Sequence, residues 1–236
     1  MEFMPQHAPF VALSFLGTGL LCFVAGVVVV YALVVGKHAL AKLAAVVAVT
    51  VGGGYLAILL SFSFFSSEKV LRAGQMKYFC EVDCHLAYSV MDVSTAETLG
   101  SGVRQATASG TFYVVTLRTW FDERTTSVGR GNGPLLPNAR WLFVIDDRGR
   151  RFNTSLEGME AIGNGATMGR GSVPLTQSLR PGDSYQTTLV FDLPSGAGIP
   201  LLYLGERHLV TLLIIGHENS PFHKKIFFAL EPQDRI

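Results

Sequence analysis

The sequence predicts a two-helix transmembrane hairpin followed by an all-β domain built as an antiparallel sandwich. Residues 9–36 and 43–67 contain no Asp, Glu, Lys or Arg, and a bilayer core needs about 20 apolar residues in a helix. Only the short segment 37–42 separates these two runs, so the helices must lie antiparallel. The rest of the chain alternates short strand-like runs with turn-rich loops, which is typical of a sandwich.

The chain therefore divides into a hairpin (1–67, with spans at about 10–36 and 43–66), a connector (68–76) and a β domain (77–236). A cleaved signal peptide is the alternative for the first span. Against it, the first eight residues contain no Lys or Arg, and the apolar run is longer than a signal core. A second span also follows at once, which favours two membrane helices.

The hairpin suggests its own packing. A turn centred near Ala39 and Leu40 places Gly26 of the first span opposite Gly53 of the second. Small residues let helix backbones approach closely in lipid, so this pair is predicted to be a helix contact.

Basic residues indicate the orientation. Lys37 and Lys42 lie in the short turn, and short basic loops stay in the cytoplasm. Lys69, Arg72 and Lys77 follow the second span and argue the other way, but the short loop usually dominates. We therefore expect a protein of the cytoplasmic (inner) membrane whose C-terminal domain faces the periplasm or the cell exterior.

Composition excludes one class of partner. The net charge is +1 among 236 residues, and the charges form no cluster. A nucleic-acid surface needs a basic patch, so the expected partners are the lipid bilayer and other membrane or extracytoplasmic proteins.

The elements of the β domain follow in order. Runs rich in β-branched and aromatic residues predict strands at 86–91, 111–121, 139–145, 150–154, 184–193, 201–205, 208–215 and 224–230. The run Asp146-Asp147-Arg148-Gly149 predicts a hairpin turn, and 156–162 a single helical turn. Loops are expected at 94–110, 122–138 and 155–173 because Gly, Ser, Thr or Pro are frequent there.

Two segments carry a resemblance. RWLFVIDDRGRRF (140–152) joins two strands through an Asp-x-x-Gly turn, and LRPGDSYQTTLVFDLP (179–194) places a strand between Leu-x-Pro-Gly and Phe-Asp-x-Pro. This pattern resembles the immunoglobulin-like sandwich domains of uncharacterised bacterial surface proteins and lipoproteins. The resemblance covers roughly 111–230 and implies a fold and an extracytoplasmic setting, but no activity.

The cysteines offer the main chemical candidate. Cys80 and Cys84 are too far apart for a disulfide in an extended strand, about 13 Å, but they can bridge in a turn or a helical coil. With His85 and Met91 they also form a set of soft ligands suited to copper.

This plan also resembles subunit two of the haem-copper oxidases, where a two-helix hairpin precedes a β domain with a binuclear copper site. Cys80, Cys84 and Met91 match the family's spacing. Tyr88 stands at the place of the family's His, His85 is displaced by three residues, and the motif opens the domain instead of ending it. A copper-binding electron-transfer subunit is therefore the alternative reading of the sequence.

Other candidates are weaker. His217 and His223 flank a polar turn that could hold a metal, although such loops are more often merely polar. Trp120, Trp141 and Phe143 are interpreted as core residues. A hydrolase is a third reading, but no nucleophile can be named for it.

The favoured hypothesis is a membrane-anchored extracytoplasmic binding or scaffold module, and an accessory subunit of a larger membrane complex is one form that such a module can take. Its motivation is the clear architecture together with the lack of a recognisable catalytic constellation, which favours a role without catalysis and without a cofactor. The loops 122–138 and 155–173 are the expected contact surfaces.

Overall fold

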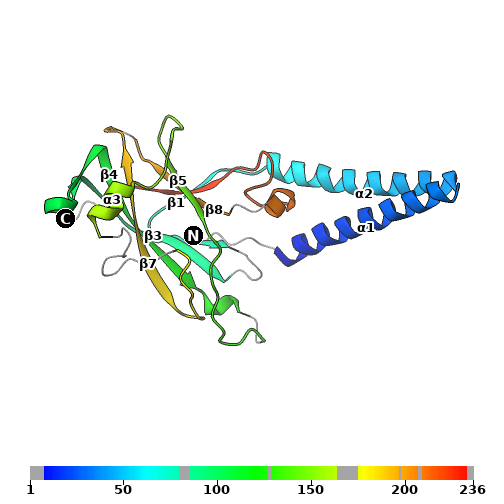
Figure 1. The fold of residues 1–236 in the computed structure, drawn as a ribbon, viewed down its shortest axis with the longest axis horizontal. Coiled ribbons are helices and arrows are strands. Elements are labelled where there is room, and N and C mark those ends of the chain that lie inside the picture. Colours follow the sequence, from blue (N-terminus) through cyan, green and yellow to red (C-terminus); the bar gives the residue numbers. More distant parts are fainter. Residues whose placement is uncertain are drawn as a thin grey trace. The chain divides into compact units, whose positions relative to one another are not determined.

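The computed structural model describes residues 8–79, 85–126, 129–163, 175–196, 198–206 and 209–232. Two apolar N-terminal helices are followed by a β-sandwich of two sheets (Figure 1). This confirms the predicted order of an apolar helix pair and an all-β domain.

The helices are α1 (Ala8–Val34) and α2 (His38–Phe64), each of 27 residues. A glycine-ended turn closes α1: Gly36 has a φ of 73°, and the N–H of Lys37 donates to Ala32 O at 2.7 Å. This pattern is a Schellman motif, in which a left-handed glycine satisfies the last helical carbonyls.

The observed turn is shorter than the predicted one. The sequence placed it at 37–42, between spans at 10–36 and 43–66, whereas α2 already begins at His38 and contains Lys42. The residues after His38 include Ala39, Leu40 and Ala41, which favour a helix strongly, so the chain becomes helical again directly after the turn.

This earlier turn changes how the helices pack. A Cβ atom added at Gly26 or at Gly53 would meet nothing within 4 Å, so the predicted glycine contact is not formed in the structure. Cys22 of α1 instead approaches α2, where its Sγ lies 3.8 Å from Ala48 O and 3.5 Å from the position of a Cβ at Gly52. Small buried side chains line the remaining contact: Ala25, Ala32, Ala41 and Ala44.

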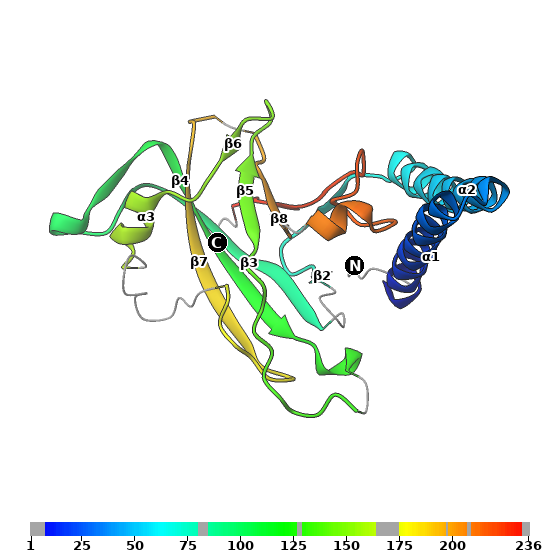
Figure 2. The same cartoon turned by 45° about the vertical axis from the view of Figure 1, so that its right-hand side comes forward.

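The sandwich contains nine strands among the described residues. They are β1 (Lys69–Leu71), β2 (Lys77–Phe79), β3 (Leu86–Leu99), β4 (Ala106–Phe121), β5 (Trp141–Ile145), β6 (Arg151–Phe152), β7 (Ser184–Leu193), β8 (Leu201–Gly205) and β9 (Ile226–Ala229). One sheet has the order β1-β9-β8-β5-β6 and the other β2-β3-β4-β7 (Figure 2). β1 pairs with β9 in parallel, and the other pairs of these strands are antiparallel.

The main core lies between the two sheets. Every second residue of β7 points into it, namely Leu189, Phe191 and Leu193, and Leu202 and Leu204 of β8 enter from the other sheet. This alternation is the period-2 pattern of a half-buried strand. This alternation explains why the sequence predicted the bounds of β7 correctly. The bounds of β8, a short continuous apolar run, were also predicted correctly.

Short elements complete this domain. The helix α3 (Leu156–Ala161) confirms the predicted helical turn, and the N–H of Gly149 donates to Asp146 O at 3.0 Å in the predicted β5–β6 turn. Among the described residues, the 3-10 helices of this domain are η1 (Gly102–Arg104) and η2 (Glu123–Thr125), and a further one, η3 (Leu209–Leu213), lies in the segment between β8 and β9.

Three local predictions were wrong. Residues 94–110 are largely strand, because β3 and β4 continue through them as a long hairpin around Gly100 and Gly102, both at positive φ. The connector 68–76 contains β1. The apolar run 208–215, predicted as a strand, contains η3 instead.

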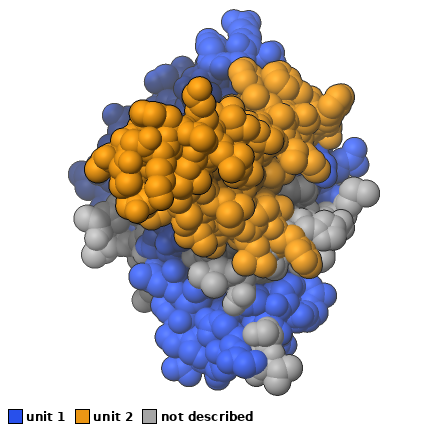
Figure 3. Space-filling model, turned by 90° about the vertical axis from the view of Figure 1, so that its right-hand side faces the viewer, with its two compact units in different colours: residues 1–5, 69–207, 226–236 blue, residues 6–68, 208–225 orange. Residues whose placement is uncertain are grey.

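The chain forms two compact units (Figure 3). The hairpin unit comprises residues 6–68 and 208–225, and the sandwich unit comprises 69–207 and 226–236 together with the first five residues. The segment that contains η3 thus belongs with the helices, although the sequence placed it within the β domain 77–236.

Candidate functional site

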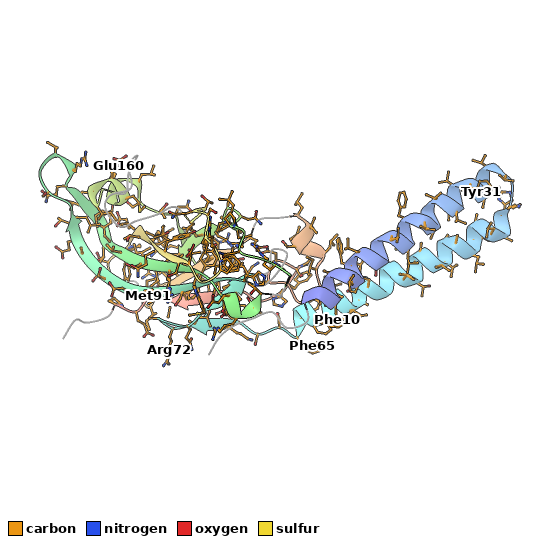
Figure 4. All side chains as sticks on the ribbon, turned by 90° about the horizontal axis from the view of Figure 1, so that it is seen from below. Phe10, Tyr31, Phe65, Arg72, Met91 and Glu160 are labelled. Carbon is orange, nitrogen blue, oxygen red and sulfur yellow. The ribbon has the colours of Figure 1, made fainter. Side chains whose placement is uncertain are left out.

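The structure separates two of the predicted copper ligands. Cys80 and Cys84 lie outside the described residues. His85 is buried just before β3, whereas Met91 is exposed on β3 (Figure 4), where the pairing with β4 shifts register. Six residues of extended strand span about 20 Å, so His85 and Met91 do not converge on one ion.

His85 has a local structural role. Its Nδ1 lies 2.6 Å from Thr125 Oγ1, and that hydroxyl donates to Asp122 O at 2.8 Å. The ring stacks on Phe121, with centroids 5.4 Å apart. His85 therefore joins the start of β3 to η2.

The Asp122 carboxylate organises the same corner. It is buried, and it accepts from Tyr78 Oη at 2.7 Å and from Nε and a terminal nitrogen of Arg124, each at 2.9 Å. Burial alone would raise the pKa of Asp122, but the hydrogen bonds from Arg124 and Tyr78 outweigh it and hold the pKa below its ordinary value.

Both flanks of the cysteine segment are thus attached to η2. Tyr78 lies in β2 and contacts Asp122, and His85 lies just before β3 and contacts Thr125. Phe79 and Leu86 are register partners, so the connection 80–85 starts and ends on neighbouring strand positions. The disulfide between Cys80 and Cys84 stays a prediction, as does metal binding by these two cysteines, whereas a site that uses both His85 and Met91 does not fit the strand.

A second polar group, here called the cation cluster, consists of Lys77, Arg140 and Glu206. Arg140 pairs with Glu206 at 2.8 Å, and its Nε donates to Tyr88 Oη at 3.1 Å. Lys77 Nζ donates to Leu204 O at 2.6 Å. All three charged side chains are buried.

The cation cluster connects the two sheets. Lys77 belongs to the four-stranded sheet, whereas its acceptors Leu204 and Ile226 belong to the five-stranded sheet. Rings also face these cations: the Arg140 guanidinium lies 4.3 Å from the Phe79 centroid, and Lys77 Nζ lies 5.2 Å from that of Tyr203. Such cation–π contacts stabilise a charge that has lost water. This geometry fits a structural role, in which the cation cluster holds the two sheets together.

Sequence reasoning missed this cluster, because lone charged residues in strand-like runs give no signal of burial. The only hint lay in the run 77–79, where Lys77 precedes two aromatic residues in a short strand that is buried throughout. Periodicity cannot assign such a residue to the core, since its burial depends on acceptors more than a hundred residues away.

Aromatic residues form a smaller cluster on the five-stranded sheet. Phe143, Tyr203 and Phe227 are buried together, and Trp141 lies 5.1 Å from Phe143 by ring centroids but stays 37% exposed. Phe143 therefore fits its interpretation as a core residue, whereas Trp141 covers the rim of the cluster. Trp120 lies beneath two guanidinium groups, those of Arg118 and Arg124.

The predicted histidine turn uses its ring nitrogens locally. His217 Nδ1 accepts from the N–H of Asn219 at 3.0 Å, and His223 Nδ1 lies 2.7 Å from Lys224 O. Within the part of the chain that the structure describes, no three His, Cys, Asp or Glu side chains gather as a metal site would require.

These features define a two-sheet β-sandwich protein that carries two apolar N-terminal helices. No family model matches the chain, and no curated protein matches it. Weak similarity connects it to three solved bacterial structures. MPT63, a secreted protein from Mycobacterium tuberculosis, is 10% identical, with a TM-score of 0.40 over 70% of this chain and 98% of that one.

The other two structures are a conserved hypothetical protein from Bacillus anthracis and the yjhA protein from Bacillus subtilis. The first is 12% identical, with a TM-score of 0.38 over 56% of this chain and 92% of that chain. The second is 13% identical, with a TM-score of 0.39 over 69% of this chain and 100% of that chain.

Proposed function

We propose that this protein is a membrane-anchored binding module, in which α1 and α2 span the bilayer and present the sandwich to a partner protein outside the cytoplasm. The observation that carries the proposal is the exposure of the helices. The candidate spans Phe10–Val34 and His38–Phe64 have mean hydropathies of 2.4 and 2.2, yet only 0% and 11% of their most apolar windows are buried.

A helix in the core of a water-soluble protein would bury such side chains. Here the large apolar residues point away from the helix pair, as Figure 4 shows for Phe10 and Tyr31. Lipid is the environment that would cover them without cost, because extended apolar surface is unfavourable in water. The exposed side chains include Phe10, Leu13, Leu16, Leu20, Phe23, Val27, Val30, Tyr31, Leu43, Val46, Val49, Leu56, Ile58 and Phe62.

The packing between the helices supports two spans over a cleaved signal peptide. Ala25 and Ala32 of α1 are buried, as are Ala41 and Ala44 of α2. Small residues at such a seam are what helix pairs in lipid use to approach closely. A signal sequence that is removed needs no fitted partner.

The basic residues support the proposed orientation. Lys37 lies in the turn and Lys42 in the first two turns of α2, so both stand at the turn end of the hairpin. Basic residues in short loops remain cytoplasmic, which leaves the sandwich on the periplasmic or extracellular side.

The strand connectivity supports an immunoglobulin-like assignment. The order β9-β8-β5-β6 with a parallel outer strand β1 corresponds to strands G, F, C and C′ of a variable-type sheet. The pairing of β4 with β7 corresponds to strands B and E. Sandwiches of this kind commonly bind through the loops at their ends.

The proposed contact residues lie in the two loops that the sequence indicates. Leu136 in the loop 122–138 and Leu156 at the start of α3 are both well exposed. Binding residues lie disproportionately on loops that a rigid scaffold positions, and these two leucines are exposed at such positions. The partner is another membrane or extracytoplasmic protein, and the module is an accessory subunit of its complex.

Anchoring and orientation are tested in intact cells. Arg148→Cys in the β5–β6 turn and His38→Cys at the start of α2 are both exposed positions that leave Lys37 and Lys42 in place. With a membrane-impermeant maleimide we expect added labelling over the parent protein for Arg148→Cys alone, and retention of the protein in alkaline-washed membranes. Added labelling of His38→Cys alone would reverse the orientation, and release into the wash would refute the anchor.

Binding is tested by photo-crosslinking. A photoreactive amino acid at Leu136 or Leu156 is expected to form a specific protein adduct, and Arg148 in the β5–β6 turn serves as the exposed control. Leu136→Ser and Leu156→Ser together should reduce co-purification of the crosslinked partner without changing the unfolding midpoint. Equal crosslinking at all three positions would argue against these loops as the contact surface.

A further inference from the structure

The loop formed by residues 209–222 is attached to α2 along its last turns. Tyr55 Oη of α2 donates to Leu213 O at 2.6 Å, and the rings of Phe64 and Phe222 stack with centroids 5.0 Å apart and planes 12° from parallel. Just beyond the loop, the N–H of Lys224 donates to Ser66 Oγ at 2.8 Å. All of these residues belong to the hairpin unit.

The polarity of the 209–222 loop is inverted relative to a loop in water. Its apolar side chains are exposed, with Leu209 at 84% and Phe222 at 67%. Its polar side chains are turned inward: Thr211, Glu218 and Ser220 are buried. A water-soluble surface loop shows the opposite arrangement, since exposing large apolar side chains and burying polar ones are both unfavourable.

The buried hydroxyls of Thr211 and Ser220 have hydrogen-bond partners within the loop, so their inward orientation is built into its fold. Asn219 Nδ2 donates to Thr211 Oγ1 at 3.0 Å, and Ser220 Oγ donates to Ile214 O at 2.6 Å. Lys225 Nζ, just beyond the loop, donates to the backbone carbonyl of Glu218 at 2.6 Å. These bonds leave the outer surface to apolar atoms, including those of Val210, Leu212 and Leu213.

The backbone also holds an aromatic ring outward. Phe222 has a φ of 64°, which is unfavourable for a side chain with a Cβ atom. In this conformation its ring lies against Phe64 while most of its surface remains exposed.

The attachment to Tyr55 sets the depth of the loop, given the membrane hairpin of the proposed function. Tyr55 lies nine residues before the end of α2 at Phe64, which is about 13 Å along the helix axis. The whole helix is about 40 Å long and the hydrocarbon core about 30 Å thick, so about 5 Å of helix extends beyond the core at each end. Tyr55 therefore lies about 8 Å inside the core boundary.

We propose that the 209–222 loop inserts into the bilayer leaflet nearest the C-terminal end of α2, as a third membrane contact beside the two spans. Leu209, Val210, Leu212, Leu213 and Phe222 lie among the acyl chains near the glycerol level. The exposed Lys224 follows directly and can reach the lipid phosphates. A penetration of about 5–10 Å is normal for interfacial helices with such an apolar face.

Tryptophan fluorescence in lipid vesicles tests the proposal on the full chain. Leu209→Trp reports on the loop, Leu136→Trp is a matched exposed leucine in the sandwich unit, and Val27→Trp is an exposed position in the middle of α1. Each variant is reconstituted in phosphatidylcholine brominated either near the glycerol or near the chain ends. The signal of Trp120 and Trp141 is removed by subtracting the parent protein.

We expect the indole of Leu209→Trp to emit at shorter wavelength than that of Leu136→Trp. The bromines near the glycerol should also quench it at least about twofold more strongly than they quench Leu136→Trp. Val27→Trp should be quenched best by the deep bromines. If Val27→Trp is quenched and Leu209→Trp is not, the loop proposal fails while the membrane hairpin stands. If neither is quenched, the anchor itself fails. A blue-shifted but unquenched Leu209→Trp would assign the surface to a protein partner and overturn the proposal.

Discussion

Arg140 and Glu206 form an ion pair that the sandwich unit encloses almost completely, with side-chain exposures of 0% and 7%. A buried pair of this kind adds little net stability compared with apolar residues of the same shape, but losing one partner leaves the other charge without compensation. The pair joins the chain before β5 to the chain after β8 within the five-stranded sheet, and Arg140 reaches the other sheet through its hydrogen bond to Tyr88 Oη.

Glu206→Gln should destabilise the sandwich strongly. Removing one member of a buried pair costs about 3–5 kcal/mol, and the amide preserves the shape of the carboxylate. Urea unfolding followed by fluorescence measures this loss, because Trp120 and Trp141 both lie in the sandwich unit. Glu97→Gln, at an exposed position of β3, should stay within about 0.5 kcal/mol of the parent. Equal effects of the two variants would contradict a structural role for the pair.

Asp122 predicts an acid dependence of stability. Its pKa is held below the ordinary value in the folded state, so the unfolded chain binds more protons once the pH falls below about 4. The free energy of unfolding should therefore be constant above about pH 5 and decrease as the solution is acidified. Asp122→Asn should lower stability at neutral pH and make the acid decrease shallower.

Part of the decrease in the free energy of unfolding at acidic pH should remain in Asp122→Asn. Burial alone would raise the pKa of Asp146, but hydrogen bonds from Arg150 and Arg148 hold it below its ordinary value, so it titrates in the same direction. A variant with an unchanged slope would show that Asp122 does not contribute to the acid transition.

Among the elements, α3 shows how a short helix is kept in place. Six residues are too few for a stable helix in water, so its packing must support it. Gly158 is buried against β7 and β4: a Cβ atom there would lie 2.5 Å from Cγ1 of Val190 and 3.3 Å from Cε1 of Phe112. The missing side chain is what lets the helix backbone approach the sheet.

Gly158→Ala should accordingly destabilise the sandwich, although alanine is the better helix former. Overpacking of this kind costs about 1–3 kcal/mol, and the χ1-restricted Val190 cannot easily turn away. Glu160→Ala, on the exposed face of the same helix, is the control and should change stability by less than about 0.5 kcal/mol. A stabilised Gly158→Ala would mean that propensity outweighs packing here.

Local patterns predicted the elements that local forces decide. β7 alternates apolar and polar residues along most of its length, β8 is a short continuous apolar run, and the turn Asp146–Gly149 uses the glycine that its geometry needs. The run 208–215 was misread because an apolar stretch looks the same whether it pairs in a sheet or packs beside a helix. Its decisive contact is Tyr55 with Leu213, 158 residues apart, which no local window contains.

The candidate sites show the same division. Cys80, Cys84, His85 and Met91 stand out by residue type, but residue type does not tell that His85 is tied to Thr125 or that Met91 faces outward. The glycine pair Gly26 and Gly53 depended on where the hairpin turns, and a shift of that turn to Gly36 moved the register.

In the whole molecule, the hairpin unit is discontinuous in sequence, because residues 208–225 return to it from the sandwich unit. A truncated chain that starts at Lys69 would keep the 209–222 loop but lose α2. We expect it to self-associate or to bind detergent, because Leu209 and Phe222 would remain exposed. Replacing 209–222 by a Gly-Ser linker should yield a monomer in size-exclusion chromatography. A monomeric truncated chain with the natural loop would contradict this.

The discontinuity of the hairpin unit also orders events during synthesis. Both helices leave the ribosome long before the 209–222 loop, which follows eight of the nine strands among the described residues. The hydrogen bond from Tyr55 to Leu213 can therefore form only after β1 to β8 have been translated. The seating of that loop follows the synthesis of β1 to β8, and it can serve as a checkpoint that reports that these strands have been translated.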